Sequence, residues 1–490
     1  MSVYSELMAF QRQTEALGAI AGRLGWDQET MMPRGSAGQR SEEMAAIEGV
    51  LHARRTDPRV GEWLEAAVPD SDVARANLRL IRREYDRTMK VPARLASEIA
   101  SVTSRAQGIW AGARAAEDVP AFLPILTEVV ALRREEAAAL AGGGSLYDAL
   151  LADYEPGTSS AEIAALFDRM RPRLVALRDR IFGADHQPSG LNGTFADDTQ
   201  AEIATKLALA FGYDMNTGRI DRAVHPFSSG SGQDVRITTR VSESDPFNCF
   251  YSTIHEVGHA AYEQGIAPEH LLTPLGRGVS MGVHESQSRI YENQLGRGPA
   301  FTSWLFKQMT EAFGDLGLPS ADAFYGAVNR CSPSYIRTEA DEVQYNLHVM
   351  LRFDLERSII AGDLEPADLE GAWNERFAAD FGIVVDKPSN GVLQDVHWSV
   401  GLFGYFPTYA LGNVYAGCLF ETLKTAVPDW QQGLAQGDAS IATGWLRENV
   451  QQFGGLYEPV EVIEKASGRT PSEEPLLTYL EDKFSAIYRL

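Results

Sequence analysis

The apolar residues of this chain repeat with the period of an α-helix over most of its length, which restricts the fold more than any other feature. Apolar residues three or four apart share one helix face, as Leu7, Phe10 and Leu17 do. The same period predicts helices near 2–24, 71–85, 93–116, 120–141, 159–182 and 198–212, and from about 247 to the end. Between about 213 and 241, glycine-rich turns and the alternating run 235–240 predict a short β-hairpin or ribbon. We therefore expect an all-α fold with a small β element near 213–241, and two helical lobes flanking a groove.

The charge balance of the chain limits its partners. The 44 Lys and Arg against 67 Asp and Glu give the 490 residues a formal net charge of −23, which would repel the phosphate backbone of nucleic acids. The N-terminus lacks the basic and apolar regions of a signal peptide, and no uncharged apolar run is long enough to cross a membrane. The three cysteines are far apart, which is typical of a reducing compartment. We expect a cytoplasmic protein that binds neither nucleic acid nor membranes.

The segment His255–His259 reads H-E-V-G-H and carries the clearest chemical signal. Residues four apart stack on one face of a helix, so both imidazoles can reach one metal ion. Glu256 points about 100° round the same turn, where it can reach a water on the metal rather than the metal itself. This is the H-E-x-x-H arrangement of zinc peptidases. The spacing alone also fits two ordinary helix histidines.

A catalytic zinc has three protein ligands and an open position, so a third ligand must lie elsewhere. Glu263 is a full turn beyond His259, roughly 6 Å along the axis, and is a poor candidate. Glu285 lies on the next predicted helix, which begins near 279 and can fold back after the turn at 265–268. We predict Glu285 as the ligand and Glu292, two turns along the same face, as a second-shell residue or plain helix surface. His284 competes as a ligand, but a pocket or core role is the commoner one.

The predicted ligand set also indicates the metal and its chemistry. Two imidazoles and one carboxylate suit Zn²⁺ best, although Co²⁺ or Mn²⁺ fits the same set. Zinc lowers the pKa of its bound water to about 7 and polarises a scissile carbonyl. Glu256 is positioned to take the proton of that water as general base and to deliver it to the leaving amine.

Four further segments of the chain are too polar and too specific for plain helix surface. They read H-E-S-Q at His284–Gln287, I-R-x-x-A-D at Ile336–Asp341, G-x-x-Q-D-x-H-W at Gly391–Trp398, and D-x-R-x-T at Asp234–Thr238. With H-E-x-G-H at His255–His259, this set resembles the Taq-type thermostable metallocarboxypeptidases. The resemblance covers essentially the whole chain, and no motif position departs from the family pattern.

The resemblance implies an enzyme that removes single residues from peptide C-termini, with broad side-chain tolerance and poor handling of proline. It implies an almost wholly helical fold whose two helical lobes flank a deep substrate groove, in a protein that is commonly a homodimer. It also marks His255, His259 and Glu285 as metal ligands and Glu256 as general base, in agreement with the residue spacing. We expect one metallocarboxypeptidase domain over 1–490, with an N-terminal helical lobe at about 1–212 and a catalytic lobe at about 213–490.

The family pattern also implies residues that bind substrate, and each has a structural alternative. Arg337 is expected to hold the free α-carboxylate of the peptide, because the planar guanidinium binds carboxylates well; its alternative is a helical salt bridge to Asp341. Arg236 is expected to limit peptide length, and its alternative is a strand salt bridge to Asp234. His284 and Gln287 are further candidates for substrate contact.

His397 is expected to donate a hydrogen bond to the substrate backbone or to the oxyanion. A tyrosine joins it, either Tyr405 or Tyr409, with a slight preference for Tyr409. Groove packing is the alternative for both tyrosines, and Trp398 is assigned to packing.

The same motifs are compatible with two other functions. The first is an oligoendopeptidase or dipeptidyl carboxypeptidase, because these helical enzymes share H-E-x-x-H and a distant glutamate ligand. The second is a metal-free peptide-binding protein in which the motif is a relic.

Overall fold

The computed structural model describes residues 2–490 and is mostly helical, with one small three-stranded sheet in the described residues. The predicted fold class is confirmed. The backbone contacts divide the chain into two compact units, each built from three separate segments. Unit 1 comprises the chain up to Thr88, Ser189–Asn329 and Tyr415–Pro471, and unit 2 comprises Met89–Pro188, Arg330–Val414 and Ser472–Leu490. These units do not follow the boundary expected near 212, and the single catalytic domain stays a prediction.

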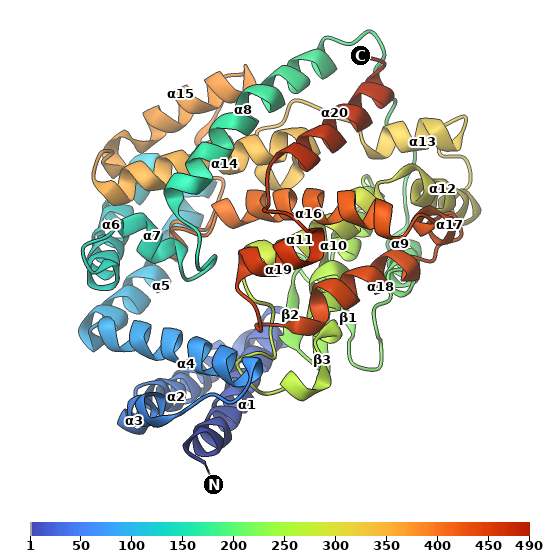
Figure 1. The fold of residues 1–490 in the computed structure, drawn as a ribbon. Helices are drawn as coiled ribbons and strands as arrows, with labels where there is room; N and C mark the ends of the chain where they lie inside the picture. Colours follow the sequence, from blue (N-terminus) through green and yellow to red (C-terminus); the bar gives the residue numbers. More distant parts are fainter. Residues whose placement is uncertain (1) are drawn as a thin grey trace. The chain divides into compact units, whose positions relative to one another are not determined.

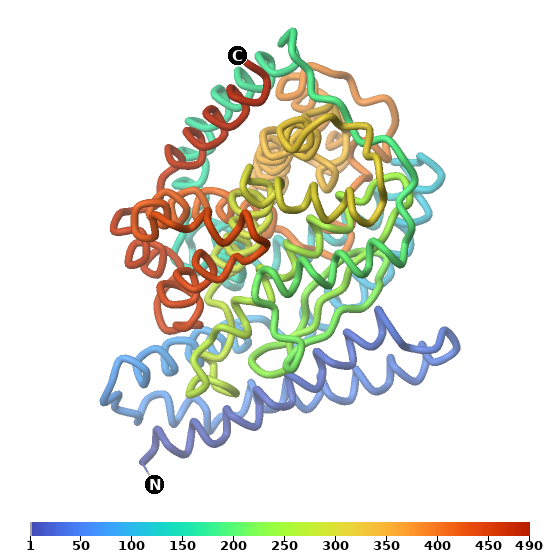
Figure 2. The backbone as a smooth tube through the Cα atoms, turned by 90° about the vertical axis from the view of Figure 1, so that its right-hand side faces the viewer, coloured from blue at the N-terminus to red at the C-terminus, as the bar shows by residue number. Residues whose placement is uncertain are grey.

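Unit 1 holds the N-terminal helices, the sheet and the helix that carries H-E-V-G-H (Figure 1). Its helices are α1 Val3–Thr30, α2 Ala37–Arg55, α3 Pro58–Ala66, α9 Asp197–Ala210, α10 Pro246–Gly265, α11 Met281–Arg289, α12 Pro299–Phe313, α13 Ala321–Val328, α17 Trp430–Leu434, α18 Ser440–Asn449, α19 Pro459–Ser467 and most of α4 Asp72–Lys90. The long helices α1 and α2 lie side by side (Figure 2). Their neighbours α3 and α4 complete an apolar cluster of Leu7, Val60, Leu64 and Ile81.

The small sheet immediately precedes α10. Its strands are β1 Ile220–Arg222, β2 Ser228–Ser231 and β3 Asp234–Thr239, in the order β1-β3-β2. Strands β2 and β3 form an antiparallel hairpin, so the predicted hairpin is present, and β1 adds to it in parallel. Gly230 has φ +106°, and a Cβ there would meet the Asp234 carbonyl oxygen at 1.9 Å. Glycine is therefore required where the hairpin closes.

Unit 2 is organised around α14 Glu342–Ala361, which is buried on nearly all sides. Asp341 caps this helix by accepting from the Val343 and Gln344 amides. The other helices of unit 2 are α5 Ala93–Ala116, α6 Val119–Ala141, α7 Leu146–Leu151, α8 Ser160–Phe182, α15 Leu369–Phe381 and α20 Glu474–Tyr488, and α16 Pro407–Ala426 begins in it. Helices α8 and α15 both pack on α14 (Figure 1).

Among residues 2–490, the structure contains no helix that has both the length and the apolar character required to cross a bilayer.

Candidate functional site

Helices α10 and α11 cross in unit 1 at Gly258, the glycine of H-E-V-G-H. Asp245 caps α10 by accepting from the Asn248 amide, and Pro246 occupies its first turn. Ser280 caps α11 in the same way. A Cβ at Gly258 would lie 2.5 Å from the Ser288 Cα, so another residue type would push the two helices apart. The close crossing brings Glu285 of α11 over the histidines of α10.

The three predicted ligands converge at this crossing. Their ligand atoms all lie within 4.8 Å of one another. The Glu285 Oε2 atom is 3.7 Å from His255 Nε2 and 3.5 Å from His259 Nε2. Two ligands at about 2.1 Å from one tetrahedral ion are separated by about 3.4 Å. The donor set and its spacing therefore fit a tetrahedral divalent ion with one position left open.

Each imidazole is held through the nitrogen that does not face Glu285. His255 Nδ1 lies 2.9 Å from Glu292 Oε2, so Glu292 contacts the ring and is not plain helix surface. His259 Nδ1 lies 2.6 Å from His284 Nδ1, and His284 Nε2 lies 2.9 Å from Glu263 Oε1. If His284 donates from Nε2 to Glu263, its Nδ1 accepts from His259. Both ligand histidines then keep Nε2 unprotonated for a metal.

Two neighbouring residues predicted to contact substrate also have internal partners. Both ring nitrogens of His284 are engaged, by His259 and by Glu263. Gln287 has no exposed surface, and its amide bonds to Ser286 and Gln451. Contact of either residue with substrate stays a prediction.

Glu285 is oriented by a charged neighbour on its own helix. Arg289 Nε donates to Glu285 Oε1 at 2.6 Å, which leaves Oε2 toward the histidines. Burial alone would raise the pKa of Glu285, but Arg289 and the two histidines outweigh it and hold that pKa well below its usual range. The carboxylate is therefore ionised, as a metal ligand must be.

The helix that carries Glu285 does not continue as predicted. The sequence predicted one α-helix through Glu292, but α11 ends at Arg289 and Ile290–Gly296 is π-helical. Single π-helical turns often occur at functional sites. The wider turn carries Glu292, whose other oxygen accepts from Arg297 at 3.2 Å. Packing decides this change of period, and the apolar repeat does not reveal it.

Glu256 follows His255 directly on α10 and has 6% of its surface exposed. Burial, together with Glu285 and Glu292, raises the pKa of Glu256 to about 7, while His255 and His284 oppose the shift. A carboxyl with a pKa near neutrality can both accept and release a proton.

A second group of predicted residues lies together in unit 2. Arg337 is 5% exposed, and its Nε and Nη1 donate to Asp395 Oδ1 at 3.3 Å and to the Tyr345 hydroxyl at 3.1 Å. The expected alternative partner was wrong, because Arg337 starts a short 3-10 turn, Arg337–Glu339, and Asp341 is occupied as the cap of α14. The Arg337 guanidinium also lies 4.8 Å from the centre of the Tyr409 ring.

His397 faces Tyr409 across this group. Its Nε2 lies 3.4 Å from the Tyr409 hydroxyl, whereas its contact with Tyr405 is between rings, at 5.8 Å between centroids. Burial lowers the pKa of His397 to about 3; Asp395 opposes this shift, and Arg337 and Arg352 add to it. A neutral imidazole can donate from one nitrogen and accept at the other.

The loop 391–406, which carries His397, is anchored to α14 through a buried glutamate. Glu356 is fully buried and accepts from the Trp398 indole at 2.9 Å, the Gly404 amide at 3.1 Å and the Tyr147 hydroxyl at 2.8 Å. Trp398, which we expected to pack, also fixes this loop by a hydrogen bond. Three donors offset the cost of burying one carboxyl group.

Arg236 of β3 lies in unit 1 and makes the salt bridge that was its structural alternative. Its Nε and Nη2 donate to the two oxygens of Asp234 at 2.7 and 3.1 Å. Asp234 also accepts from Arg23 of α1 at 2.6 Å, and the Arg236 guanidinium lies 4.5 Å from the centre of the Trp26 ring. A role for Arg236 in limiting peptide length stays a prediction.

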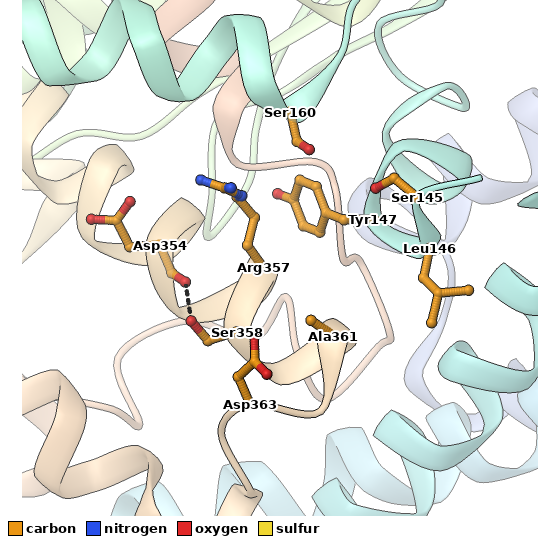
Figure 3. Close-up of a pocket in the computed structure, with 9 residues that line it drawn as sticks. All are labelled: Ser145, Leu146, Tyr147, Ser160, Asp354, Arg357, Ser358, Ala361 and Asp363. Carbon is orange, nitrogen blue, oxygen red and sulfur yellow. Dashed lines mark hydrogen bonds between the residues drawn. The ribbon is translucent and has the colours of Figure 1, made fainter.

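The structure also contains an open pocket in unit 2, about 560 Å³ in volume, beside the C-terminal half of α14 (Figure 3). Tyr147, Arg357 and Asp363 are among the residues that line it. None of the site residues predicted from the sequence belongs to its lining.

Comparison with known proteins gives a consistent result. The family described as carboxypeptidase Taq (M32) metallopeptidase matches residues 6–484. The chain is 42% identical to thermostable carboxypeptidase 1 of Thermus thermophilus, over 99% of both chains. It superposes on the crystal structure of an M32 carboxypeptidase from Deinococcus radiodurans with a TM-score of 0.96, at 36% identity and over 100% of both chains. Metallocarboxypeptidase 1 of Trypanosoma cruzi gives a TM-score of 0.95 at 31% identity, over 98% of this chain and 99% of that one.

Replacement of Gly258 by alanine should weaken metal binding, because its Cβ would force α11 and Glu285 away from the histidines. Overpacking of this kind costs about 1–3 kcal/mol of stability, so we also expect a lower melting temperature. Titration calorimetry with Zn²⁺ and thermal unfolding would measure both effects. Gly49→Ala is the matched control, since Gly49 lies in α2 with open space at its Cβ. Equal zinc affinity in the two variants would contradict the role of the helix crossing.

Glu263→Gln should lower the affinity for zinc by about 10–100-fold, as loss of a second-shell partner typically does. The neutral amide would no longer fix the His284 tautomer that accepts from His259. Competition with a zinc chelator would measure the affinity. Glu269→Gln is the control, because Glu269 is exposed and lies six residues further along. Unchanged zinc affinity in Glu263→Gln would show that His259 needs no such support.

Proposed function

Because the chain belongs to the carboxypeptidase Taq (M32) family of metallopeptidases, we propose that it uses zinc to remove single residues from the free C-termini of peptides. The family makes it a metal-dependent carboxypeptidase; the zinc, the single-residue step and a broad tolerance of side chains are our proposal. The observation that carries it is the convergence of His255, His259 and Glu285 at the crossing of α10 and α11.

Two imidazoles and one carboxylate suit Zn²⁺, and Co²⁺ or Mn²⁺ could take the same place. A divalent ion held there supplies a Lewis acid for the scissile carbonyl and activates a water molecule for attack. His255 and His259 would present Nε2 to the ion, and Glu285 would present Oε2. Glu292 behind His255, and Glu263 acting through His284 behind His259, raise the basicity of these two histidines as ligands.

Glu256 is proposed as the general base and then the general acid. It would take a proton from the attacking water and pass it to the leaving amine. Its position directly after His255 on α10 and its burial support both steps, because a residue one step along the helix can reach a water on the ion without being a ligand.

Arg337 is proposed to bind the α-carboxylate at the end of the peptide. Burial makes a charge-assisted bond to this group stronger than it would be in water. His397 is proposed to donate a hydrogen bond to the substrate backbone or the oxyanion, with Tyr409 as its companion. The 3.4 Å contact between their polar atoms supports Tyr409 over Tyr405. Homodimer formation and a cytoplasmic location stay predictions.

Mass spectrometry of a peptide ladder tests the proposed activity. A free-acid peptide should lose residues one at a time from its C-terminus, and a chelator should stop the loss. The C-terminal amide of the same peptide should be cleaved much more slowly, because Arg337 requires a carboxylate. Internal cleavage would favour an oligoendopeptidase, release of dipeptides would favour a dipeptidyl carboxypeptidase, and no cleavage with added Zn²⁺ or Co²⁺ would favour a metal-free binding protein.

Glu256→Gln should retain the metal and lose about 10²–10⁴-fold in kcat, which is what a positioned general base contributes. The amide has nearly the same shape but cannot accept the proton. Steady-state kinetics on a free-acid dipeptide would measure kcat, and elemental analysis of the purified variant would measure its metal content. Turnover close to that of the unmodified enzyme would refute the assigned role.

A further inference from the structure

Two buried guanidinium groups share one carboxylate in unit 2, and they share it unequally. Arg352 Nε lies 2.7 Å and its Nη2 lies 2.5 Å from Asp395 Oδ2. Arg337 reaches the other oxygen, Oδ1, through Nε alone at 3.3 Å. Short contacts to ionised groups are the strong ones. The carboxylate of Asp395 therefore pairs mainly with Arg352.

We propose that Arg352 is a positioning residue for substrate recognition: it holds Asp395 back from Arg337 and so keeps the Arg337 guanidinium available to the C-terminal carboxylate of the peptide. The proposal rests on the proposed function, in which Arg337 binds that carboxylate. Under this proposal, Arg337 and Arg352 compete for the carboxylate of Asp395, and this competition sets the affinity of Arg337 for substrate.

The surroundings of Arg352 hold it in place. Its side chain has no exposed surface, its Nη1 donates to the His348 carbonyl at 2.7 Å, and its guanidinium lies 4.6 Å from the centre of the Trp373 ring. Burial lowers the pKa of Arg352 to about 10, with Asp395 opposing that shift, so the group remains charged at neutral pH. A fixed cation of this kind fixes its anionic partner.

The nearby titratable groups leave Asp395 as the principal anion for both arginines. His348 and His397 are neutral at pH 7, because burial lowers the pKa of each. Glu356, one turn further along α14, has its pKa raised to about 7 by burial, and its carboxyl group is occupied by Trp398, Gly404 and Tyr147.

Arg337 keeps a donor for a ligand. Its Nε faces Asp395 and its Nη1 donates to Tyr345. Its Nη2 makes no hydrogen bond to any residue within 2–490. If Arg352 lost its charge, Asp395 could turn both oxygens to Arg337 and form the bidentate pair that arginine and carboxylate prefer. Arg337 would then be paired with Asp395 and would no longer bind the C-terminal carboxylate of the substrate.

Calorimetric titration of the full-length, metal-loaded protein tests this competition without turnover. The ligand is a dipeptide whose scissile amide is replaced by a methylene-amine link, used as the free acid and as the C-terminal amide. The unmodified protein should bind the acid more tightly than the amide. Arg352→Met should weaken binding of the acid about tenfold or more, as for one lost charge-assisted bond, and leave binding of the amide unchanged.

The double variant Arg352→Met with Asp395→Asn separates positioning from a merely structural role. Removing the charge of Asp395 frees Arg337 again, so the double variant should recover the preference for the acid that Arg352→Met loses. A structural role predicts instead that the second substitution makes binding worse. Failure of the double variant to recover, or an unchanged acid preference in Arg352→Met, would overturn the proposal.

Two further variants keep the test decisive if Arg352→Met does not fold. Arg352→Lys retains the charge and should keep most of the acid preference, and Asp395→Asn alone should keep or increase it. Loss of acid preference in Asp395→Asn would overturn the proposal. If the unmodified protein binds acid and amide equally, the role of Arg337 in the proposed function fails instead, so the two failures can be told apart.

Discussion

The metal centre depends on the contact between the α10 and α11 backbones at Gly258. At this contact the Glu285 carboxylate of α11 comes within 3.5–3.7 Å of the two imidazoles of α10. Packed helices are usually separated by 8–10 Å between axes, and a Cβ at this position would already collide with Ser288. A glycine inside a helix costs about 1 kcal/mol relative to alanine, and here the glycine allows Glu285 to approach the two histidines.

The groups around both sites share one arrangement: a partner holds one atom of the functional side chain and leaves another atom available. Glu292 holds His255 by Nδ1, Arg289 holds Glu285 by Oε1, and the Tyr345 hydroxyl holds Arg337 by Nη1. Buried ion pairs contribute little net stability, because desolvation offsets their attraction. Their value here lies in orientation, since a side chain fixed through one atom presents the other atom in a single direction.

The sequence predicted the parts of this arrangement that local spacing determines. Two histidines four apart must share a helix face. The helical period predicted α10, and the alternating run 235–240 predicted the strands that precede it. Partners distant in sequence were not visible: Glu263 supports His284 from 21 residues away, and Arg352 meets Asp395 across 43 residues. Nor does the pattern indicate where an α-helix widens into a π-helical turn at Ile290, or that Arg337 lies in a 3-10 turn, because packing decides both.

Helix α14 shows why unit 2 can carry functional groups on an irregular loop. Loops that bind substrate need a rigid support, because the entropy of ordering them would otherwise oppose binding. Arg352 holds this loop at Asp395, and Glu356, one turn along the same helix, holds it at Trp398 and Gly404. Two buried polar side chains, Arg352 and Glu356, four residues apart on α14, thus fix the loop on either side of His397. The same helix donates the Tyr345 hydroxyl as a partner for Arg337, so the guanidinium and the imidazole are positioned by one rigid element.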